Sequence, residues 1–203
     1  MLPIKSKYRI AKRLGSAIFE QTQTQKFALS EARGKQRTRK GGRGGPSDYN
    51  RQLLEKQRLR FTYGLKEREL SNYAKRAYTE TDPTQALHSV LEMRADSIVY
   101  RAGFAPTRRA GRQMVSHGHI LVNGKRITTP SYKLKKGDVL TVREGSRTSS
   151  LFTREEGEEA LRTPSQWLSF DAPQMKLEIL GEPTYSITET LIDYATVFEF
   201  YSR

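Results

Sequence analysis

Arginine side chains are concentrated at the start of a predicted helix that Thr107 caps. Arg108, Arg109 and Arg112 lie within its first turns. Unpaired N–H groups and the helix dipole at an N-terminus favour an anion, and guanidinium groups add charge and bidentate hydrogen bonds. The spacing predicts a phosphate-binding surface, against the simpler interpretation of a solvated helix face. We expect its exposed side to carry Arg108, Arg109, Arg112, Gln113 and Ser116.

A basic hairpin is predicted directly after this helix. In ILVNGKRI, residues 120–127, Asn123-Gly124 separates two short apolar runs, which is the strongest local signal for a two-residue β-turn. Lys125 and Arg126 follow the turn. We therefore expect Asn123, Lys125 and Arg126 to extend the phosphate-binding surface.

Chemistry other than anion binding has no candidate residues in this sequence. The chain contains no Cys, which excludes disulfides, thiolate metal sites and cysteine nucleophiles. His117 and His119 lack a nearby carboxylate or thiol to complete a metal site, so we expect both imidazoles to meet phosphate, base or core. No nucleophile elbow, zincin helix, dinucleotide fingerprint or phosphate loop is present. The sequence predicts no enzymatic activity, no metal and no cofactor.

Charge is unevenly distributed along the 203 residues. Lys and Arg number 36 against 22 Asp and Glu, a net charge of +14. Residues 1–60 carry a net charge of +12, residues 61–145 one of +7, and residues 146–203 one of −5. A polyanion is the expected partner of the cationic part, and protein or solvent that of the acidic end. No apolar run is long enough to cross a bilayer and no signal peptide is apparent, so we expect a cytoplasmic chain and no membrane partner.

The densest basic segment lies between residues 33 and 46, where cationic residues alternate with glycines. It cannot bury enough apolar surface to fold in water. We expect it to order along a phosphate backbone, which the glycines allow to approach closely, with a flexible cationic linker as the alternative. Its predicted nucleic-acid contacts are Arg33, Lys35, Arg37, Arg39, Lys40 and Arg43.

Secondary structure is predicted to change in character near residue 92. Apolar spacing predicts helices over 47–64, 66–78 and from Thr81 to about residue 92, with shorter helices over 96–103 and after Thr107. Short strands are expected over 120–127, at Tyr132 and Leu134, and over 139–143. The pattern predicts an α+β fold, in which a helical domain is joined to a helix pair packed on a small antiparallel sheet. Basic residues on the helices give further predicted contacts, namely Arg51, Lys56, Arg58, Arg60, Arg68 and Arg101.

The chain divides into segments at these changes. We expect residues 1–46 to form a flexible basic extension, 47–92 a helical domain, 93–157 the α+β unit, and 158–203 a C-terminal segment. The acidic run Glu155–Glu159 indicates a solvated helix. The apolar ending, which includes Val197 and Phe198, predicts that residues 184–203 pack back on the helical domain.

Several long motifs resemble those of one known family, in the same order. TRRAGRQMVSHGHILVNGKRI and PSYKLKKGDVLTVRE are similar to the S-four RNA-binding domain. SDYNRQLLEKQRLRFTYGLKERELSNYAKRA is similar to the helical region of bacterial small-subunit ribosomal protein four, and LEMRADSIVYRAGF joins the two. WLSFDAPQMK and LIDYATVFEFYSR resemble that family's C-terminal end. The resemblance covers nearly the whole chain from about Arg33.

The resemblance implies a non-enzymatic role in the small ribosomal subunit. Members of the family are primary binders of 16S rRNA that grip a multi-helix junction in its 5′ domain and nucleate assembly of the body of the 30S subunit. With neighbouring proteins five and twelve they influence translational accuracy, and with proteins three and five they surround the mRNA entry channel. We expect the same partners here, and a location in the ribosomes of the cytoplasm or of an organelle.

Two features depart from the family pattern. Many relatives carry cysteines near the N-terminus, in some binding zinc, and this chain has none. We therefore expect its first forty-odd residues to be ordered by RNA or not at all. Gly111 stands where relatives often have a better helix former, at a cost of about 1 kcal/mol in helix propensity. We expect this glycine to let RNA approach closely.

Two alternative functions share the same RNA-binding module. The S-four domain also occurs in pseudouridine synthases and some tRNA synthetases, so an RNA-modifying enzyme is one alternative. It requires a separate catalytic domain, for which neither flank offers a large α/β body or a general base. A stress-related RNA-binding protein is the other alternative, and co-migration with small subunits on a sucrose gradient distinguishes it from a ribosomal component.

Overall fold

The computed structural model describes residues 4, 6–37, 47–149, 151–152, 165–171 and 173–202. The chain forms two compact units, one of residues 1–87 with 186–203 and the other of residues 88–185. The first unit therefore combines both ends of the chain. The predicted contacts Arg39, Lys40 and Arg43 and the acidic run at 155–159 lie outside the described residues.

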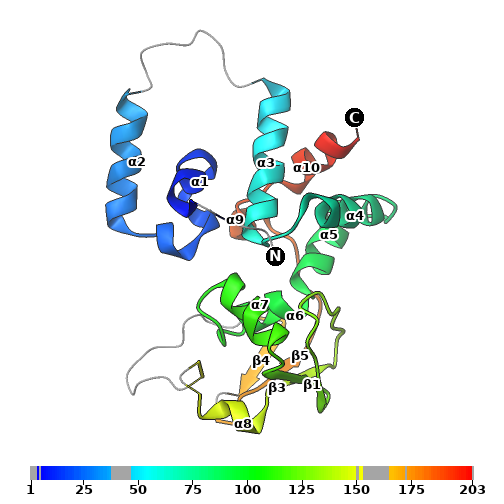
Figure 1. The fold of residues 1–203 in the computed structure, drawn as a ribbon. Coiled ribbons are helices and arrows are strands. Elements are labelled where there is room, and N and C mark those ends of the chain that lie inside the picture. The colour runs from blue at the N-terminus through cyan, green and yellow to red at the C-terminus, as the bar shows by residue number, and fades with distance from the viewer. Residues whose placement is uncertain are drawn as a thin grey trace. The chain divides into compact units, whose positions relative to one another are not determined.

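Helices build the first unit (Figure 1). Their bounds are α1 (Lys7–Leu14), the 3-10 turns η1 (Ser16–Ile18) and η2 (Glu20–Thr22), α2 (Gln25–Arg37), α3 (Asp48–Thr62), α4 (Glu67–Ala77), α9 (Ile187–Thr190) and α10 (Tyr194–Tyr201). Helix α5 (Pro83–Glu92) begins in this unit and ends in the second. Ser47 caps α3 by accepting a hydrogen bond from Asn50 N at 3.3 Å. Asp82 caps α5 through the N–H groups of Thr84 and Gln85, both at 3.1 Å. Such side-chain caps satisfy N–H groups that have no partner inside the helix.

Residues 7–37 are folded, so the expectation that the first forty-odd residues stay flexible without RNA is wrong for this segment. Ala11, Phe19 and Phe27 form a small buried cluster, and Phe61 of α3 packs against it. The Nε of Arg58 donates a hydrogen bond to Leu14 O at 2.7 Å, which ties the end of α1 to α3. Burial of these apolar side chains stabilises the segment. They are few and widely spaced among basic residues, so the composition of the segment did not predict a core.

The last helix, α10, packs against α3 and α4 (Figure 1). Tyr194, Val197 and Phe198 are buried on its inner side. Gln52 of α3 donates a hydrogen bond to Glu199 at 3.0 Å. Together these contacts join the end of the chain to helices that precede it by more than a hundred residues.

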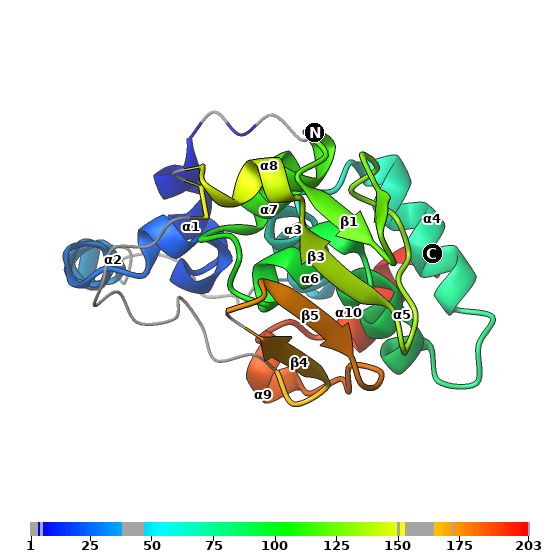
Figure 2. The ribbon, with the colours of Figure 1, turned by 90° about the horizontal axis from the view of Figure 1, so that it is seen from below.

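The second unit packs two helices on a five-stranded antiparallel sheet, which confirms the predicted α+β class. The strand order is β2-β1-β3-β5-β4, and Figure 2 shows β1, β3, β5 and β4 side by side. The bounds are α6 (Ala95–Arg101), α7 (Arg108–Ser116), β1 (Ile120–Val122), β2 (Lys125–Arg126), β3 (Val139–Val142), α8 (Glu144–Arg147), β4 (Leu168–Asp171) and β5 (Lys176–Ile179).

The sheet contains different outer strands from those predicted. The prediction of a strand at Tyr132 and Leu134 is wrong, because this segment makes one isolated bridge, between Lys133 and Arg94. Ala95 N donates to Tyr132 O and Leu134 N to Met93 O, both at 2.9 Å. The segment therefore pairs with the chain just before α6, and β5 occupies the place beside β3.

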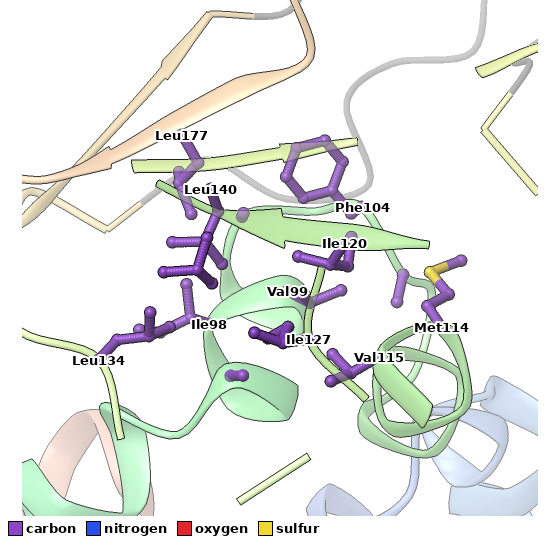
Figure 3. Packing of buried hydrophobic residues seen from close by; sticks show 14 of the residues in the cluster. Ile98, Val99, Phe104, Met114, Val115, Ile120, Ile127, Leu134, Leu140 and Leu177 are labelled. Atoms are coloured by element: carbon purple, nitrogen blue, oxygen red, sulfur yellow. The ribbon is translucent and has the colours of Figure 1, made fainter. Parts of the chain in front are cut away.

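A single apolar core lies between the helix pair and the sheet in the described part of this unit (Figure 3). Ile98 and Val99 come from α6, and Met114 and Val115 from α7. The sheet and the connecting segments contribute Phe104, Ile120, Ile127, Leu134, Leu140 and Leu177. Burial of one face of α7 in this core fixes which of its side chains point elsewhere.

Gly111 of α7 lies directly against the backbone of α6. A Cβ at this position would be 2.9 Å from Asp96 O and 3.5 Å from the Cβ of Ala105. Because real Cβ atoms do not come so near a backbone oxygen, either helix would have to move. The expectation that Gly111 serves RNA approach is therefore wrong, since this residue is buried and its missing side chain serves helix packing.

Gly111→Ala is expected to lower the free energy of unfolding of the second unit by about 1–2 kcal/mol, because overpacking outweighs the helix propensity gained. Urea unfolding followed by circular dichroism measures the change. Gly145→Ala in α8 is the matched control, because its added Cβ meets no atom within 4 Å. Equal stability of Gly111→Ala and the wild type would contradict this interpretation of the helix contact.

Candidate nucleic-acid interface

The N-terminus of α7 is formed as a capped helix start with arginines in its first two turns. Thr107 Oγ1 accepts a hydrogen bond from Ala110 N at 3.1 Å, so Thr107 acts within the fold as the predicted cap. The first turn of α7 contains no acidic residue. Its positive dipole end therefore lies beside the guanidinium groups of Arg108 and Arg109 without a carboxylate of its own helix to oppose them.

A buried carboxylate holds two of the predicted contact residues. Arg101 donates to both oxygens of Glu92, at 2.8 and 3.0 Å, and Arg108 donates to the same carboxylate at 2.8 Å. The Glu92 side chain is only 1% exposed. Arg108 also lies over the Tyr100 ring, with its Cζ 4.6 Å from the ring centroid. These contacts restrict both arginines to one orientation.

A second buried carboxylate, that of Asp96, lies in the first turn of α6. Arg94 donates to the two oxygens of Asp96 at 2.9 and 2.7 Å, in the bidentate geometry typical of arginine and carboxylate. Arg112 Nη1 lies 3.8 Å from Asp96. This nitrogen is buried and makes no hydrogen bond to the residues that the structure describes. A buried N–H group without an acceptor is unfavourable.

The predicted exposed side of α7 is therefore wrong in two of its five members. Arg108 points toward Glu92 of α5 and Arg112, one helical turn later, toward Asp96 of α6, whereas Arg109, Gln113 and Ser116 are exposed. Substitutions of solvent-exposed residues generally leave stability unchanged. Substitution of Arg108 or Arg112 is expected to lower it, because both side chains contact buried carboxylates. Spacing along the sequence did not reveal this, because the carboxylates that receive these side chains belong to α5 and α6.

The whole cluster is cationic, because four guanidinium groups surround two carboxylates. Arg94, Arg101, Arg108 and Arg112 each contact Glu92 or Asp96. Because these contacts already restrict the arginine side chains, less side-chain conformational entropy is lost when a ligand binds. Exposed Arg109 and the N-terminus of α7 add positive charge beside them. The arrangement suits a ligand with several anionic oxygens, such as a phosphate backbone.

Glu92 and Asp96 are the site residues that the sequence analysis did not predict. Their alternation with Arg94 in the sequence was the available signal.

The turn after α7 uses some of its polar groups within the fold. Arg126 donates to His117 O at 3.0 Å and to Gly118 O at 3.2 Å, where the carbonyl groups of the helix end favour a cation. His119 Nδ1 lies 2.9 Å from Ser146 Oγ. Burial lowers the pKa of His119, and the charges of His117, Arg126 and Arg143 lower this pKa further. His119 is therefore held neutral near pH 7, while His117 is exposed.

Two residues of the hairpin tip differ in their role: Asn123 is bound within the turn, and Lys125 is exposed. Asn123 donates from Nδ2 to Asp138 at 2.8 Å and accepts from Val139 N at 2.9 Å, so both ends of its side chain are bound within the turn. Its backbone is left-handed, with φ of 48°, as a two-residue hairpin turn requires. Asn123 thus shapes the tip rather than offering its amide to a partner. Lys125 of β2 is exposed.

Several basic residues predicted as contacts in the first unit are engaged internally. Lys56 is buried and bonds to Glu67 at 2.9 Å, so its prediction as a surface contact is wrong. Arg60 lies 3.8 Å from the same carboxylate. Arg58 binds Leu14 O and the Glu55 carboxylate. By contrast, the side chains of Arg33, Arg51 and Arg68 are exposed.

Lys35 and Arg37 lie within α2, but the structure describes only their backbone. Across the described ranges, no group of three or more His, Asp or Glu residues is arranged to hold a metal ion. No helix among the described residues is long and apolar enough to span a membrane.

Comparison with known proteins identifies two family matches. The S4 domain family matches residues 93–140, and the ribosomal protein S4/S9 N-terminal domain family matches residues 4–93. The small ribosomal subunit protein uS4 of Syntrophomonas wolfei is 40% identical over 164 residues, 80% of this chain and 78% of that protein. The protein of the same name from Mesomycoplasma hyopneumoniae is 39% identical over 97% of this chain and 96% of its own length. That from Borrelia turicatae is 34% identical over 98% and 96%.

Proposed function

Because this chain belongs to the bacterial-type ribosomal protein S4 family, we propose that it is a structural constituent of the small ribosomal subunit. In this proposal it binds 16S rRNA as a primary binder, grips a multi-helix junction in the 5′ domain, and nucleates assembly of the body of the 30S subunit. Its family consists of ribosomal proteins rather than enzymes, which supports a role through binding alone.

The observation that carries the RNA-binding role is the arginine cluster on α6 and α7. Buried Glu92 holds Arg101 and Arg108 in place, Arg112 lies 3.8 Å from buried Asp96, and the cluster keeps an excess of positive charge. An RNA helix has a deep, narrow major groove that side chains enter poorly, so contacts to phosphates and to RNA shape are the expected mode of recognition. A preformed set of guanidinium groups fits that mode because it matches a backbone rather than a base sequence.

Exposed polar and basic residues extend this surface within the second unit. They are Arg109, Gln113, Ser116, His117 and Lys125. In the first unit the proposed contacts are Arg33, Arg51 and Arg68, with Lys35, Arg37, Arg39, Lys40 and Arg43 from the segment rich in glycine. By holding RNA helices in fixed relative directions, such contacts lower the entropic barrier to later assembly steps.

Protein neighbours are proposed from the same family relationship. We place the chain in the ribosome beside small-subunit protein five, with proteins twelve and three and the mRNA close by, and we propose that it influences translational accuracy through those neighbours. Sucrose-gradient fractionation tests the ribosomal location. Stoichiometric co-migration with small subunits is expected, and occasional association would instead favour the stress-related alternative.

RNA binding is expected to depend steeply on salt. Six to ten phosphate contacts would weaken affinity by roughly 10³ to 10⁵ between 50 and 200 mM salt, because each neutralised phosphate releases condensed counterions. Filter binding to a transcript of the 16S 5′ domain measures this slope. A flat response to salt would remove the phosphate-clamping mechanism.

A further inference from the structure

Tyr78, which directly follows α4, and two aromatic side chains of α10 line an open cavity of about 240 Å³ in the first unit. Its lining consists of Ala74, Lys75, Tyr78, Phe198, Tyr201 and Ser202. Pockets for drug-sized molecules usually measure about 300–1,000 Å³. The cavity is smaller than these, so it suits one flat ring system rather than a larger ligand.

Two walls of this cavity are held rigidly by the fold. Phe198 is buried in the contact of α10 with the rest of the unit. The Tyr201 hydroxyl donates a hydrogen bond at 2.9 Å to Glu67, which also accepts from Lys56 at 2.9 Å. Burial and the Glu67 carboxylate raise the pKa of Tyr201, so its phenol remains a neutral donor. A preformed wall reduces the conformational entropy that a ligand must remove on binding.

The third wall, Tyr78, is exposed at the end of α4. This side chain is 61% exposed, although it is a large aromatic residue. Its ring centroid lies 6.0 Å from that of Phe198, with an angle of 48° between the ring planes. The tilted pair is not closely stacked, and the Tyr78 ring presents a face that no other described aromatic ring is seen to cover. An exposed aromatic face beside an apolar cavity is the feature that bases stack upon.

The charge around the cavity favours an anionic partner and opposes a cationic one. Lys75 is the one charged residue of the lining, and the next residue, Arg76, is exposed as well. No carboxylate lines the cavity. Glu199, the acidic residue of α10, accepts a hydrogen bond from Gln52. A ligand that joins a flat apolar ring to a negative backbone therefore fits both features of the site.

We propose that this cavity binds one unstacked nucleobase of the RNA partner, with the base stacked on Tyr78 and its flanking phosphate beside Lys75. Ser202 lines the cavity, and because its hydroxyl donates to Glu199 O at 3.1 Å, its oxygen is left to accept a hydrogen bond from the base edge. The inference deepens the proposed function by adding a site for a single-stranded nucleotide. Unpaired bases of loops and bulges are recognised in this way, because they can leave the RNA stack.

Tyr78→Ala tests this site directly. Base stacking on an aromatic residue is worth about 1–3 kcal/mol, so the affinity for a 16S 5′-domain transcript is expected to fall by roughly 5- to 150-fold. Tyr78→Phe retains the ring and should bind within about twofold of the wild type. The salt slope of Tyr78→Ala should equal that of the wild type, whereas Lys75→Ala should reduce the slope by about 1 through loss of one phosphate contact. Tyr132→Ala, which removes an exposed tyrosine of the second unit, is the control for loss of a ring.

The possible results distinguish failure of the nucleobase site from failure of the proposed function. Failure of the wild type to bind the transcript would overturn the proposed function. Wild-type affinity in Tyr78→Ala, with normal binding otherwise, would overturn the nucleobase site alone, as would a side chain of a partner protein found in the cavity. Photo-crosslinking of 4-thiouridine-containing transcript is the second measurement. Crosslinks from an unpaired nucleotide to the peptides holding Tyr78 or Tyr201 are expected, and their absence would contradict the site.

Discussion

Glu92→Ala is expected to destabilise the second unit by about 3–5 kcal/mol, because removal of one partner leaves buried charge without compensation. Arg101 and Arg108 both donate to this carboxylate, whose side chain is 1% exposed. Both arginines would lose this acceptor, and because their side chains are only 29% and 15% exposed, water replaces it in part. Urea unfolding of the full chain, followed at the far-UV signal, measures the loss.

Matched substitutions separate charge from packing at this position. Glu92→Gln keeps the volume and one carbonyl acceptor, so its loss should be smaller than that of Glu92→Ala. Glu178→Ala removes an exposed carboxylate from β5 and should change stability by no more than about 0.5 kcal/mol. If Glu92→Ala unfolds at the same urea concentration as Glu178→Ala, the buried carboxylate does not hold the arginine cluster together.

Leu140→Ala is expected to lower the free energy of unfolding by about 2–5 kcal/mol, because it removes buried atoms and leaves a cavity. Leu140 is fully buried on β3, where its backbone partners are Val122 of β1 and Leu177 of β5. Figure 3 shows its side chain among those of the core cluster. Thermal unfolding with a fitted enthalpy gives the change in free energy.

The neighbouring residue on the same strand provides the control for Leu140→Ala. Thr141 points to the opposite face of the pleated sheet and is half-buried. Thr141→Ala should cost about 1 kcal/mol or less, mainly through lower strand propensity. Similar losses in both variants would show that the core does not lie on the Leu140 face of the sheet.

Local patterns in the sequence were sufficient for the elements that carry their own signals. The caps at Ser47 and Thr107, the Asn123-Gly124 turn and the three- and four-residue apolar spacing predicted α3, α7 and the β1–β2 hairpin close to their observed bounds. Each of these signals acts within a few residues, because capping, turn conformation and helix periodicity depend on neighbouring backbone groups.

Partners distant in sequence decided the elements that were predicted wrongly. The segment around Tyr132 is not a strand of the sheet, because β5, some forty residues later in the chain, pairs with β3 instead. Residues 7–37 fold because Phe61 of α3 and the aromatic residues of the N-terminal segment share a cluster. Gly111 serves the contact of α6 and α7, which no periodicity of either helix alone reveals.

The sequence by itself determined that this protein is a basic, cysteine-free chain with an α+β module, because composition and short-range spacing fix those properties, and it predicted a polyanionic partner. Tertiary structure alone decided which basic side chains a ligand can meet. Lys56, Arg58 and Asn123 are engaged within the fold, and Glu92 and Asp96 orient the arginines of α6 and α7. A basic side chain forms an internal ion pair when folding places a carboxylate beside it, and otherwise it stays accessible to a ligand. For the arginines of α7, those carboxylates lie on other helices.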